Sequence, residues 1–269
     1  MKYVYLSHKI SKSLIKNVLF KLKIKMVDIC MVMVSTFQYF ADRSDILFQA
    51  FLVTVRLCLY AAVFGFMLGV LASLSKLSTH RILRWPATVY IEIFRGTPLL
   101  VQLYVMSFAY PIFIHEVLGV TLVRNTWTNP ASFWDATIVL SLNTGAYQAE
   151  IIRAGIQSLP VGQTEAARSV GLTHTQSLRY IILPQAFRVV LPPMANEYIN
   201  LVLNSSLASI IVVRELTYWA KVLTSQSFRT LQIWFVVGGI YFMVTLTLSR
   251  TFQYTEKRTR IPGLGPMRN

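Results

Sequence analysis

Charged side chains are scarce in this chain. Asp, Glu, Lys and Arg make up 14% of the 269 residues, whereas hydrophobic residues make up 54%. An ordinary soluble domain carries about a quarter charged residues, so this composition excludes that class of protein. The apolar residues also form long runs of the kind that cross a bilayer. We therefore predict an integral membrane protein.

Acidic residues are scarcer still, because 11 Asp and Glu face 26 Lys and Arg and the formal net charge is +15. In a soluble protein, this excess would indicate nucleic-acid binding. Here the basic residues flank the apolar runs, so the sidedness of the loops and contact with anionic lipid explain them better. We predict a membrane-lipid partner and no nucleic acid.

Motifs of catalysis and metal binding are missing. Cys30 and Cys58 are isolated, without a Cys-x-x-Cys pattern or a nearby histidine, so we expect neither a metal site nor a disulfide. The chain has no Gly-x4-Gly-Lys-Ser/Thr and hence no P-loop for ATP phosphates. His-Glu-x-x-His and Gly-x-Ser-x-Gly are absent as well. We predict that the chain is not an enzyme, binds no cofactor and draws its energy from another polypeptide.

Five apolar segments are long enough for a membrane span, which takes about 20 helical residues. They lie near 48–74, 97–115, 136–157, 188–212 and 232–250. The regions after the first, third and fifth segments hold twelve Lys and Arg residues, and the other two loops hold four. Since cytoplasmic loops carry the excess of basic residues, we predict that the first set is cytoplasmic. Segment 116–135, with Trp127 and Trp134, would then lie outside.

The N-terminal segment does not fit this scheme. Residues 1–25 contain seven lysines and no acid, with apolar residues at four-residue spacing from Ile10 to Leu22. Such a basic amphipathic pattern suits an anionic membrane surface, yet five spans and a cytoplasmic tail would put it outside. Residues 26–41 are apolar but interrupted by Asp28. Three interpretations stay open: a short sixth span, an interfacial segment, or a start codon assigned too early, and we favour the last two.

Small residues follow one face of the first apolar segment. Ala61, Gly65, Gly69 and Ser73 recur at four-residue intervals, which predicts close approach of a neighbouring helix. Arg56 lies near the outer end of the same segment, and we expect its side chain to reach the interface.

A short Ala-rich helix is predicted in the loop 158–185, between the third and fourth segments. Pro160 ends the third segment, and residues 163–170 then form an amphipathic pattern. Gly171 suits the C-terminus of such a helix. The loop continues to a second helix that begins near His174 and that Pro184 is expected to interrupt.

These residues resemble a known coupling element. Glu165-Ala-Ala, Gly171 and then Ile181-Ile-Leu-Pro184 stand at offsets similar to those of the EAA loop of ABC-importer permeases. The resemblance implies that this loop binds a separate ATPase, with small side chains deep in a groove and polar ones at its rim. The implied coupling residues are Glu165, Ala166, Ala167, Arg168 and Gly171.

Other stretches narrow the resemblance to permeases for polar amino acids, of the histidine, glutamine and arginine type. They are Glu92-Ile-Phe-Arg-Gly-Thr-Pro98-Leu-Leu-Val-Gln102, Tyr147-Gln-Ala-Glu150-Ile-Ile-Arg153-Ala-Gly-Ile-Gln157, Asn196-Glu-Tyr-Ile-Asn200-Leu and Glu215-Leu216. The implied fold is an all-α, polytopic, type I (MetI-like) transmembrane domain with about five spanning helices. It would comprise a permease domain at 48–250 containing the coupling loop, after a basic segment at 1–47 and before a basic cytoplasmic tail at 251–269.

Two acid–base pairs lie within the resembling stretches. Glu92 and Arg95 are three residues apart, as are Glu150 and Arg153, so each pair can meet across one helical turn. Such pairs more often brace a helix end than touch a transported molecule, and we predict a structural or gating role.

The fourth segment carries the candidate substrate pathway. Asn196, Asn200 and Asn204 lie at four-residue spacing, with Glu197 beside them. Polar groups at membrane depth are costly unless they face other helices or a wet cavity. Both interpretations stay open, namely contact with the substrate and interhelical hydrogen bonds across a permease dimer. The family usually has Lys-x-Thr/Ser where this chain has Asn204-Ser205-Ser206, which puts transfer of family contacts there in doubt.

The resemblance implies a multi-pass permease subunit in the bacterial inner membrane, driven by ATP. ATP and Mg²⁺ would be bound by the partner ATPase, an extracytoplasmic amino-acid-binding protein would meet the outer loops near 115–135 and 210–231, and a second permease, identical or related, would complete the pathway. One alternative is an ion-coupled secondary transporter, which should show inverted repeats and acids in both halves. The other is a membrane scaffold that does not transport.

Overall fold

The computed structural model describes residues 35, 38–118 and 130–259. The predictions for residues 1–34, for the outer loop around Trp127 and for the end of the tail at 260–269 lie outside the described residues. The chain forms two compact units, residues 1–49 and residues 50–269. In the described part of the first unit, the chain enters helix α2 (Ser44–Leu77) after a turn in which Ser44 Oγ donates to the Ala41 carbonyl at 2.9 Å.

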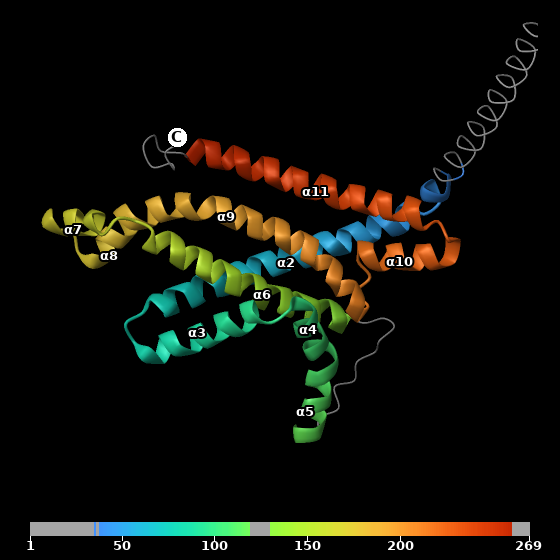
Figure 1. The fold of residues 1–269 in the computed structure, drawn as a ribbon, viewed down its shortest axis with the longest axis horizontal. Helices are drawn as coiled ribbons and strands as arrows, with labels where there is room; N and C mark the ends of the chain where they lie inside the picture. Colours follow the sequence, from blue (N-terminus) through green and yellow to red (C-terminus); the bar gives the residue numbers. More distant parts are fainter. Residues whose placement is uncertain (1–34, 36–37, 119–129, 260–269) are drawn as a thin grey trace, which may run out of the picture. The chain divides into compact units, whose positions relative to one another are not determined.

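The described residues form helices joined by short turns, as the all-α prediction requires (Figure 1). After α2 the elements are α3 (Arg81–Gly96), α4 (Leu99–Tyr104), the π-helical turn η1 (Val105–Ala109), α5 (Tyr110–Leu118), α6 (Pro130–Gln157), α7 (Val161–Ser169), α8 (His174–Ser177), the π-helical turn η2 (Leu178–Ile182), α9 (Leu183–Asn204), the 3₁₀-helix η3 (Ser205–Ile211), α10 (Leu216–Ser227) and α11 (Thr230–Thr259).

Within the described residues, three stretches are long and apolar enough to cross a membrane, namely Ser44–Leu77, Leu99–Val117 and Thr230–Arg258. The pair His174–Ile211 and Leu216–Ser227, bent by 53°, makes a fourth if it is one span. These stretches coincide with the first, second, fifth and fourth predicted segments. The stretch that starts at Thr230 continues as helix α11 beyond the predicted end at residue 250. Basic residues such as Lys257 and Arg258 in its last turn favour a helix C-terminus there.

Helix α6 corresponds to the third predicted span, but it is not among the helices that are apolar enough to cross a membrane by composition. Its polar side chains are buried inside the protein: Thr137, Ser141, Asn143, Thr144 and Gln148 are at most 6% exposed. A helix surrounded by other helices needs no apolar surface. In the described part of the second unit, α6 packs against α3, α4, α9 and η3, which accounts for its polarity.

The small-residue stripe of α2 packs against α6, as predicted. A Cβ added to Gly69 would lie 2.9 Å from the Gln148 Cβ, and one added to Gly65 would lie 3.2 Å from the Ser141 carbonyl oxygen. Both distances are too short for an ordinary side-chain contact. The backbones of the two helices therefore meet directly, where dispersion rather than removal from water stabilises the contact.

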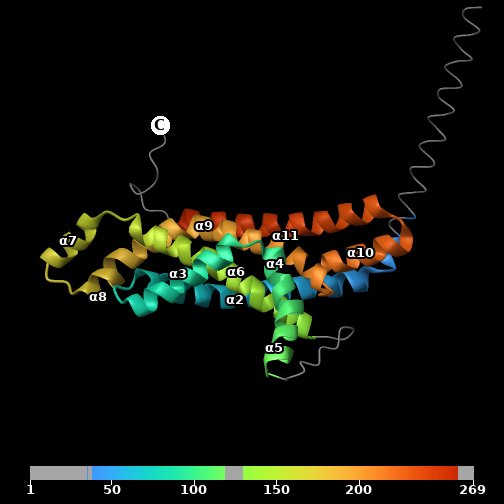
Figure 2. The same ribbon diagram turned by 60° about the horizontal axis from the view of Figure 1, so that its bottom comes forward.

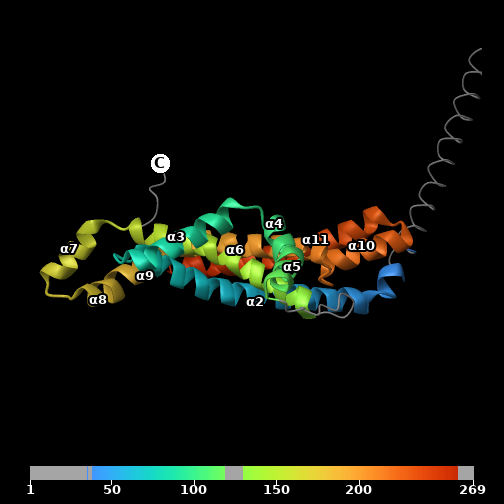
Figure 3. The same cartoon turned by 90° about the horizontal axis from the view of Figure 1, so that it is seen from below.

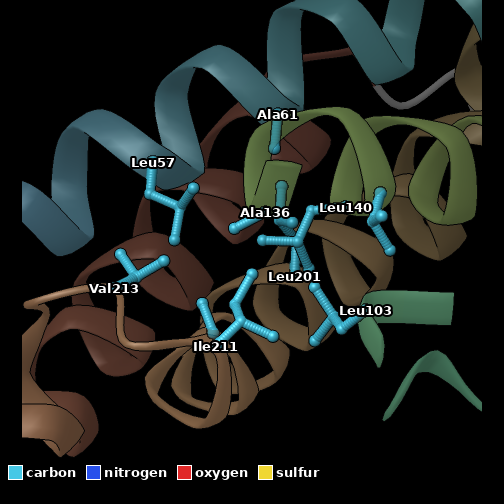
Figure 4. Packing of buried hydrophobic residues seen from close by; sticks show 10 residues of the cluster. Leu57, Ala61, Leu103, Ala136, Leu140, Leu201, Ile211 and Val213 are labelled. Atoms are coloured by element: carbon cyan, nitrogen blue, oxygen red, sulfur yellow. The ribbon is translucent and has the colours of Figure 1, made fainter. Parts of the chain in front are cut away.

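A cluster of buried apolar residues joins α2, α4, α6, α9 and η3. Figure 4 shows side chains from these elements converging on one core, with Leu57, Ala61, Leu103, Ala136, Leu140, Leu201, Ile211 and Val213 labelled. Leu57, Ala61 and Leu103 are 0% exposed. The core therefore fixes the relative positions of the helices that carry the predicted site residues.

The two ends of the second unit carry different features. In Figures 1, 2 and 3, α7 and α8 lie at one end of the bundle and α10 lies at the opposite end. This arrangement agrees with the loop predictions, which assign the α7–α8 region and the α10 region to opposite sides of the membrane.

Candidate functional site

The predicted coupling helix exists as α7, but it begins at Val161 rather than at residue 163. Pro160 occupies the N-cap position, and its fixed φ favours helix entry directly after it. At the other end Gly171 has φ +88°. Its N–H donates to the Arg168 carbonyl at 3.0 Å, and the Leu172 N–H donates to the Ala167 carbonyl at 3.1 Å. Glycine adopts this left-handed conformation without strain, so its predicted place at the helix end is confirmed.

The side chains of α7 do not all face outward. Glu165, Ala166 and Arg168 are exposed, whereas Ala167 is 6% exposed and lies against the loop itself. Ala167 therefore belongs to the interior of the loop in this structure, and the outward surface of α7 is formed by its neighbours.

Three large apolar side chains of the loop are exposed, at the two ends of α7 and in η2. Val161 is 73% exposed, Val170 is 78% exposed and Tyr180 is 61% exposed. The sequence prediction missed these three residues, because a single apolar residue in a polar loop gives no periodic signal. Exposed apolar groups around one short helix are typical of a surface that a partner covers.

The second helix of the loop is not interrupted by Pro184, contrary to the prediction. α8 starts with a capping box, in which the Gln176 N–H donates to Thr173 Oγ1 and Gln176 Oε1 accepts from the Thr173 N–H. The chain then passes through η2 into α9, with Pro184 in the first turn of α9. A proline there needs no N–H donor, so the helical path continues to Asn204.

One of the two predicted acid–base pairs is present. The Arg153 guanidinium donates to Glu150 Oε1, and Lys76 Nζ lies 3.1 Å from Glu150 Oε2. Glu92 pairs with Lys76 at 3.8 Å instead of with Arg95. Arg95 lies over the ring of Tyr147, with 5.4 Å between its Cζ and the ring centroid. The spacing of residues along one helix could not predict the Lys76–Glu92 pair or the contact of Arg95 with Tyr147, because in each case the partner comes from another helix.

A polar pocket of about 440 Å³ lies between the α3–α4 turn, α6 and α9. It is lined by Arg95, Gly96, Thr97, Pro98, Leu99, Asn143, Tyr147, Glu197, Asn200 and Asn204. The pocket brings together residues from three stretches that are far apart in the sequence. Asn196, the fourth predicted pathway residue, is exposed and lies outside this lining.

Helix geometry explains which residues of α9 reach the pocket. Glu197, Asn200 and Asn204 follow an i, i+3, i+7 pattern, which keeps side chains on one narrow stripe. The predicted stripe at spacing of four drifts around the helix, and its first member, Asn196, falls off the pocket face. Three of the four predicted residues, Glu197, Asn200 and Asn204, therefore share one polar face of α9, and their contact with a substrate stays a prediction.

The pocket lining includes one carboxyl group and one guanidinium group. Glu197 is 8% exposed, whereas Arg95 is exposed and lies at the α3–α4 turn. Amides from Asn143, Asn200 and Asn204 complete the polar lining. The sequence prediction missed Asn143, although an amide in the middle of an apolar segment is a signal of a buried or wet environment.

The end of the bundle that carries α10 is held by Glu215, which is 0% exposed. Its carboxylate accepts the N–H of Thr217 at 2.9 Å and of Tyr218 at 2.8 Å, and the Tyr241 hydroxyl donates to it at 2.8 Å. The residue thus caps α10 and fastens α11 to it. Apart from the resemblance at Glu215-Leu216, the sequence did not indicate this role. The partner Tyr241 lies in a different helix, so local sequence around Glu215 does not show the contact.

Comparison with known proteins yields a consistent set of matches. Residues 65–261 match the family described as "Binding-protein-dependent transport system inner membrane component". The chain is 39% identical over 206 residues to the L-cystine transport system permease protein TcyB of Bacillus subtilis, covering 76% of this chain and 82% of that protein. It is 40% identical over 216 residues to the octopine transport system permease protein OccM of Rhizobium radiobacter, covering 78% and 85%.

Solved structures agree with the sequence matches. A crystal structure of an amino acid ABC transporter with histidines superposes with a TM-score of 0.72 at 34% sequence identity. The match covers 82% of this chain and 98% of that chain.

Proposed function

The chain belongs to the family of binding-protein-dependent transport system inner membrane components, and on this premise we propose that it carries polar amino acids through a pathway lined by the pocket at Glu197. It is a permease subunit of an ABC importer for amino acids, with the all-α, MetI-like fold of such subunits. Proteins of this family are integral to the inner membrane, and we assign the chain to the bacterial inner membrane as a multi-pass protein.

The observation that carries the proposal is the pocket itself. An amino acid has a carboxylate, an ammonium group and, in the polar class, a side chain that forms hydrogen bonds. Arg95 offers a cation for the carboxylate, Glu197 offers an anion for the ammonium group, and the asparagine amides suit the polar side chain. Asn196 lies outside the pocket lining, and we assign it to contacts with neighbouring helices.

The cytoplasmic end supplies the coupling surface. We assign Glu165, Ala166 and Arg168 to direct contact with an ABC ATPase, together with the exposed Val161 and Val170. Ala167 is buried in the loop, and Gly171 ends α7 with its positive φ. ATP and Mg²⁺ are bound by that ATPase, so this chain needs no catalytic residue of its own.

Further partners follow from the same assignment. An extracytoplasmic amino-acid-binding protein delivers the substrate to the end of the bundle that carries α10, and a second permease subunit, identical or related, completes the pathway. Closure of the ATPase on ATP moves α7, and the bundle passes between two states that open the pocket to opposite sides. The pairs of Lys76 and Arg153 with Glu150 brace the cytoplasmic end during this movement.

Uptake measurements in the native host test the proposal. Deletion of the gene should abolish high-affinity uptake of at least one ¹⁴C-labelled polar amino acid, and the purified complex should hydrolyse ATP faster when that amino acid and its binding protein are added. A scaffold would leave uptake intact on deletion. A secondary transporter would drive uptake into proteoliposomes from a sodium or proton gradient without ATP.

A further inference from the structure

We propose that Gln102 is a positioning residue for substrate selection, which holds the α3–α4 turn so that Arg95 and Thr97 form one wall of the pocket. The inference rests on the proposed function of that pocket. Gln102 itself is half-buried on α4 and is not part of the pocket lining, so it acts through other residues.

The amide nitrogen of Gln102 lies within hydrogen-bond distance of three acceptors in the turn, which share its two hydrogens. Nε2 lies 2.9 Å from the Phe94 carbonyl oxygen, 3.1 Å from the Thr97 carbonyl oxygen and 2.9 Å from Thr97 Oγ1. The Thr97 hydroxyl in turn donates to the Ile93 carbonyl at 2.8 Å. A single side chain from α4 therefore connects both sides of the turn that separates α3 from α4.

The oxygen of the same amide is held from a third helix. Asn143 Nδ2, on α6, donates to Gln102 Oε1 at 3.1 Å and to the Phe94 carbonyl at 3.1 Å. Asn143 is 6% exposed and lines the pocket. Its contacts tie the pocket wall formed by the turn to the pocket wall formed by α6.

These hydrogen bonds satisfy backbone carbonyl groups at the C-terminus of α3 that have no partner within the helix. The last carbonyls of an α-helix have no partner within the helix, and α3 ends at Gly96, so the Phe94 carbonyl is one of them. Pro98 at the start of α4 donates no N–H to the turn. Gln102 and Asn143 both donate to the Phe94 carbonyl, so removal of either residue leaves this half-buried carbonyl with one donor instead of two.

The turn determines where the cation of the pocket lies. Arg95 stands one residue after Phe94 and rests on the Tyr147 ring, while Thr97 and Pro98 line the pocket beside it. Binding groups must be held within about 0.5 Å of their working positions to be effective. Loss of the Gln102 bonds should therefore move the carboxylate-binding side of the pocket without removing any group that touches substrate.

The test replaces the chromosomal gene in the native host with Gln102→Ala or Gln102→Glu and measures uptake kinetics for the ¹⁴C-amino acid that the deletion strain fails to import. Gln102→Glu keeps the size and the acceptor for Asn143, but it puts an oxygen against two carbonyls in place of the amide donor. We expect both variants to raise the apparent KM about tenfold, with a changed order of competition among unlabelled amino acids. Membrane levels, measured by immunoblot, should stay near wild type.

Asn143→Ala and the double variant Gln102→Ala/Asn143→Ala test the network. A shared network predicts that the two KM effects are not additive. Gln253→Ala is the matched control, because Gln253 bonds only Ser249 at the exposed end of α11 within the described residues, and its KM should equal that of wild type.

Three results overturn the inference. An unchanged KM and competition order, with Vmax falling in proportion to the amount of protein, would show that Gln102 serves stability alone. Wild-type behaviour of Gln102→Glu would show that the amide donor is dispensable. If the deletion strain imports every amino acid at the wild-type rate, the proposed function fails, and this inference fails with it. The first two results, obtained while the deletion strain does lose uptake, overturn this inference alone.

Discussion

Lys76 Nζ lies 3.1 Å from Glu150 Oε2 and joins the end of α2 to α6. The same ammonium lies 3.8 Å from Glu92 on α3, so one cation serves three helices. Only 17% of the Lys76 side chain and 20% of the Glu150 side chain are exposed. A pair so protected from water is stronger than a surface ion pair, and it closes the α2–α6 contact at the C-terminal end of α2.

Lys76→Met should therefore destabilise the purified chain by about 1–3 kcal/mol, because it leaves Glu150 with one cation instead of two. Thermal unfolding in lipid nanodiscs measures the effect as a lower Tm. Lys257→Met, in the exposed last turn of α11, is the matched control and should shift Tm little. An equal shift in both variants would mean that overall charge, rather than this pair, sets the stability.

Helices α6 and α9 pack tightly against each other at Gly155. A Cβ added there would lie 2.2 Å from Val190 Cγ2, and a β-branched side chain in a helix has few other rotamers to adopt. Gly155→Ala should cost about 1–3 kcal/mol of stability. Second-site Val190→Ala should restore part of the loss, which a Tm comparison of the single and double variants measures.

Gly162 provides the control for this effect. It lies in α7 with nothing within 4 Å of its added Cβ, so Gly162→Ala should leave stability unchanged or raise it by up to about 1 kcal/mol through helix propensity. A large loss in Gly162→Ala, or none in Gly155→Ala, would contradict the role given to packing.

Features that depend on a single helix followed from the sequence. The pair Gly65 and Gly69 predicted a close helix contact because two residues four positions apart lie on the same face of a helix. Gly171 was placed correctly at the end of α7 because few other residues adopt positive φ without strain. In both cases the local chain determines the outcome.

Features that depend on contacts between two or more helices could not be predicted from the sequence. Lys76 was counted as an ordinary loop charge, and Arg95 was paired with Glu92, since the partners that bind them come from other helices. Asn143 lies 53 residues before Asn196, the first residue of the predicted pathway on α9, and nothing in its local sequence shows that the fold brings it to Asn200 and Asn204. The pocket is thus a property of the assembled bundle.

Substitution of Ala166 should separate coupling from folding. Ala166 is exposed, whereas Ala167 is buried in the loop, so Ala166→Trp adds bulk only to the outer surface of α7. We expect normal membrane insertion but loss of substrate-stimulated ATP hydrolysis in the reconstituted complex. Thr175→Trp, at an exposed position of α8, should retain hydrolysis. Retained hydrolysis in Ala166→Trp would remove this face from the ATPase contact.

Asn196 and Asn200 of the predicted stripe should differ in their effect on uptake. Asn200 lines the pocket and Asn196 does not, although both are exposed in the chain by itself. Asn200→Ala should raise the KM for the transported amino acid about fivefold or more, the value of one lost hydrogen bond, and Asn196→Ala should leave it near wild type. Glu197→Gln should change the preference between cationic and neutral amino acids. Equal KM values for all three variants and wild type would exclude the pocket from the pathway.

Glu215 should stabilise the end of the bundle that carries α10. It accepts three hydrogen bonds while fully buried, and hydrogen bonds to a charged group are worth about 1.5–3 kcal/mol each. Glu215→Gln keeps the shape but turns an amide N–H toward these donors, so it should speed hydrogen exchange of the α10 amides by tenfold or more. Tyr241→Phe removes one donor and should have a smaller effect in the same direction. Mass spectrometry of exchanged peptides separates α10 from α7, whose exchange should not change in either variant; faster exchange at both ends would show global destabilisation and contradict a local role for the carboxylate.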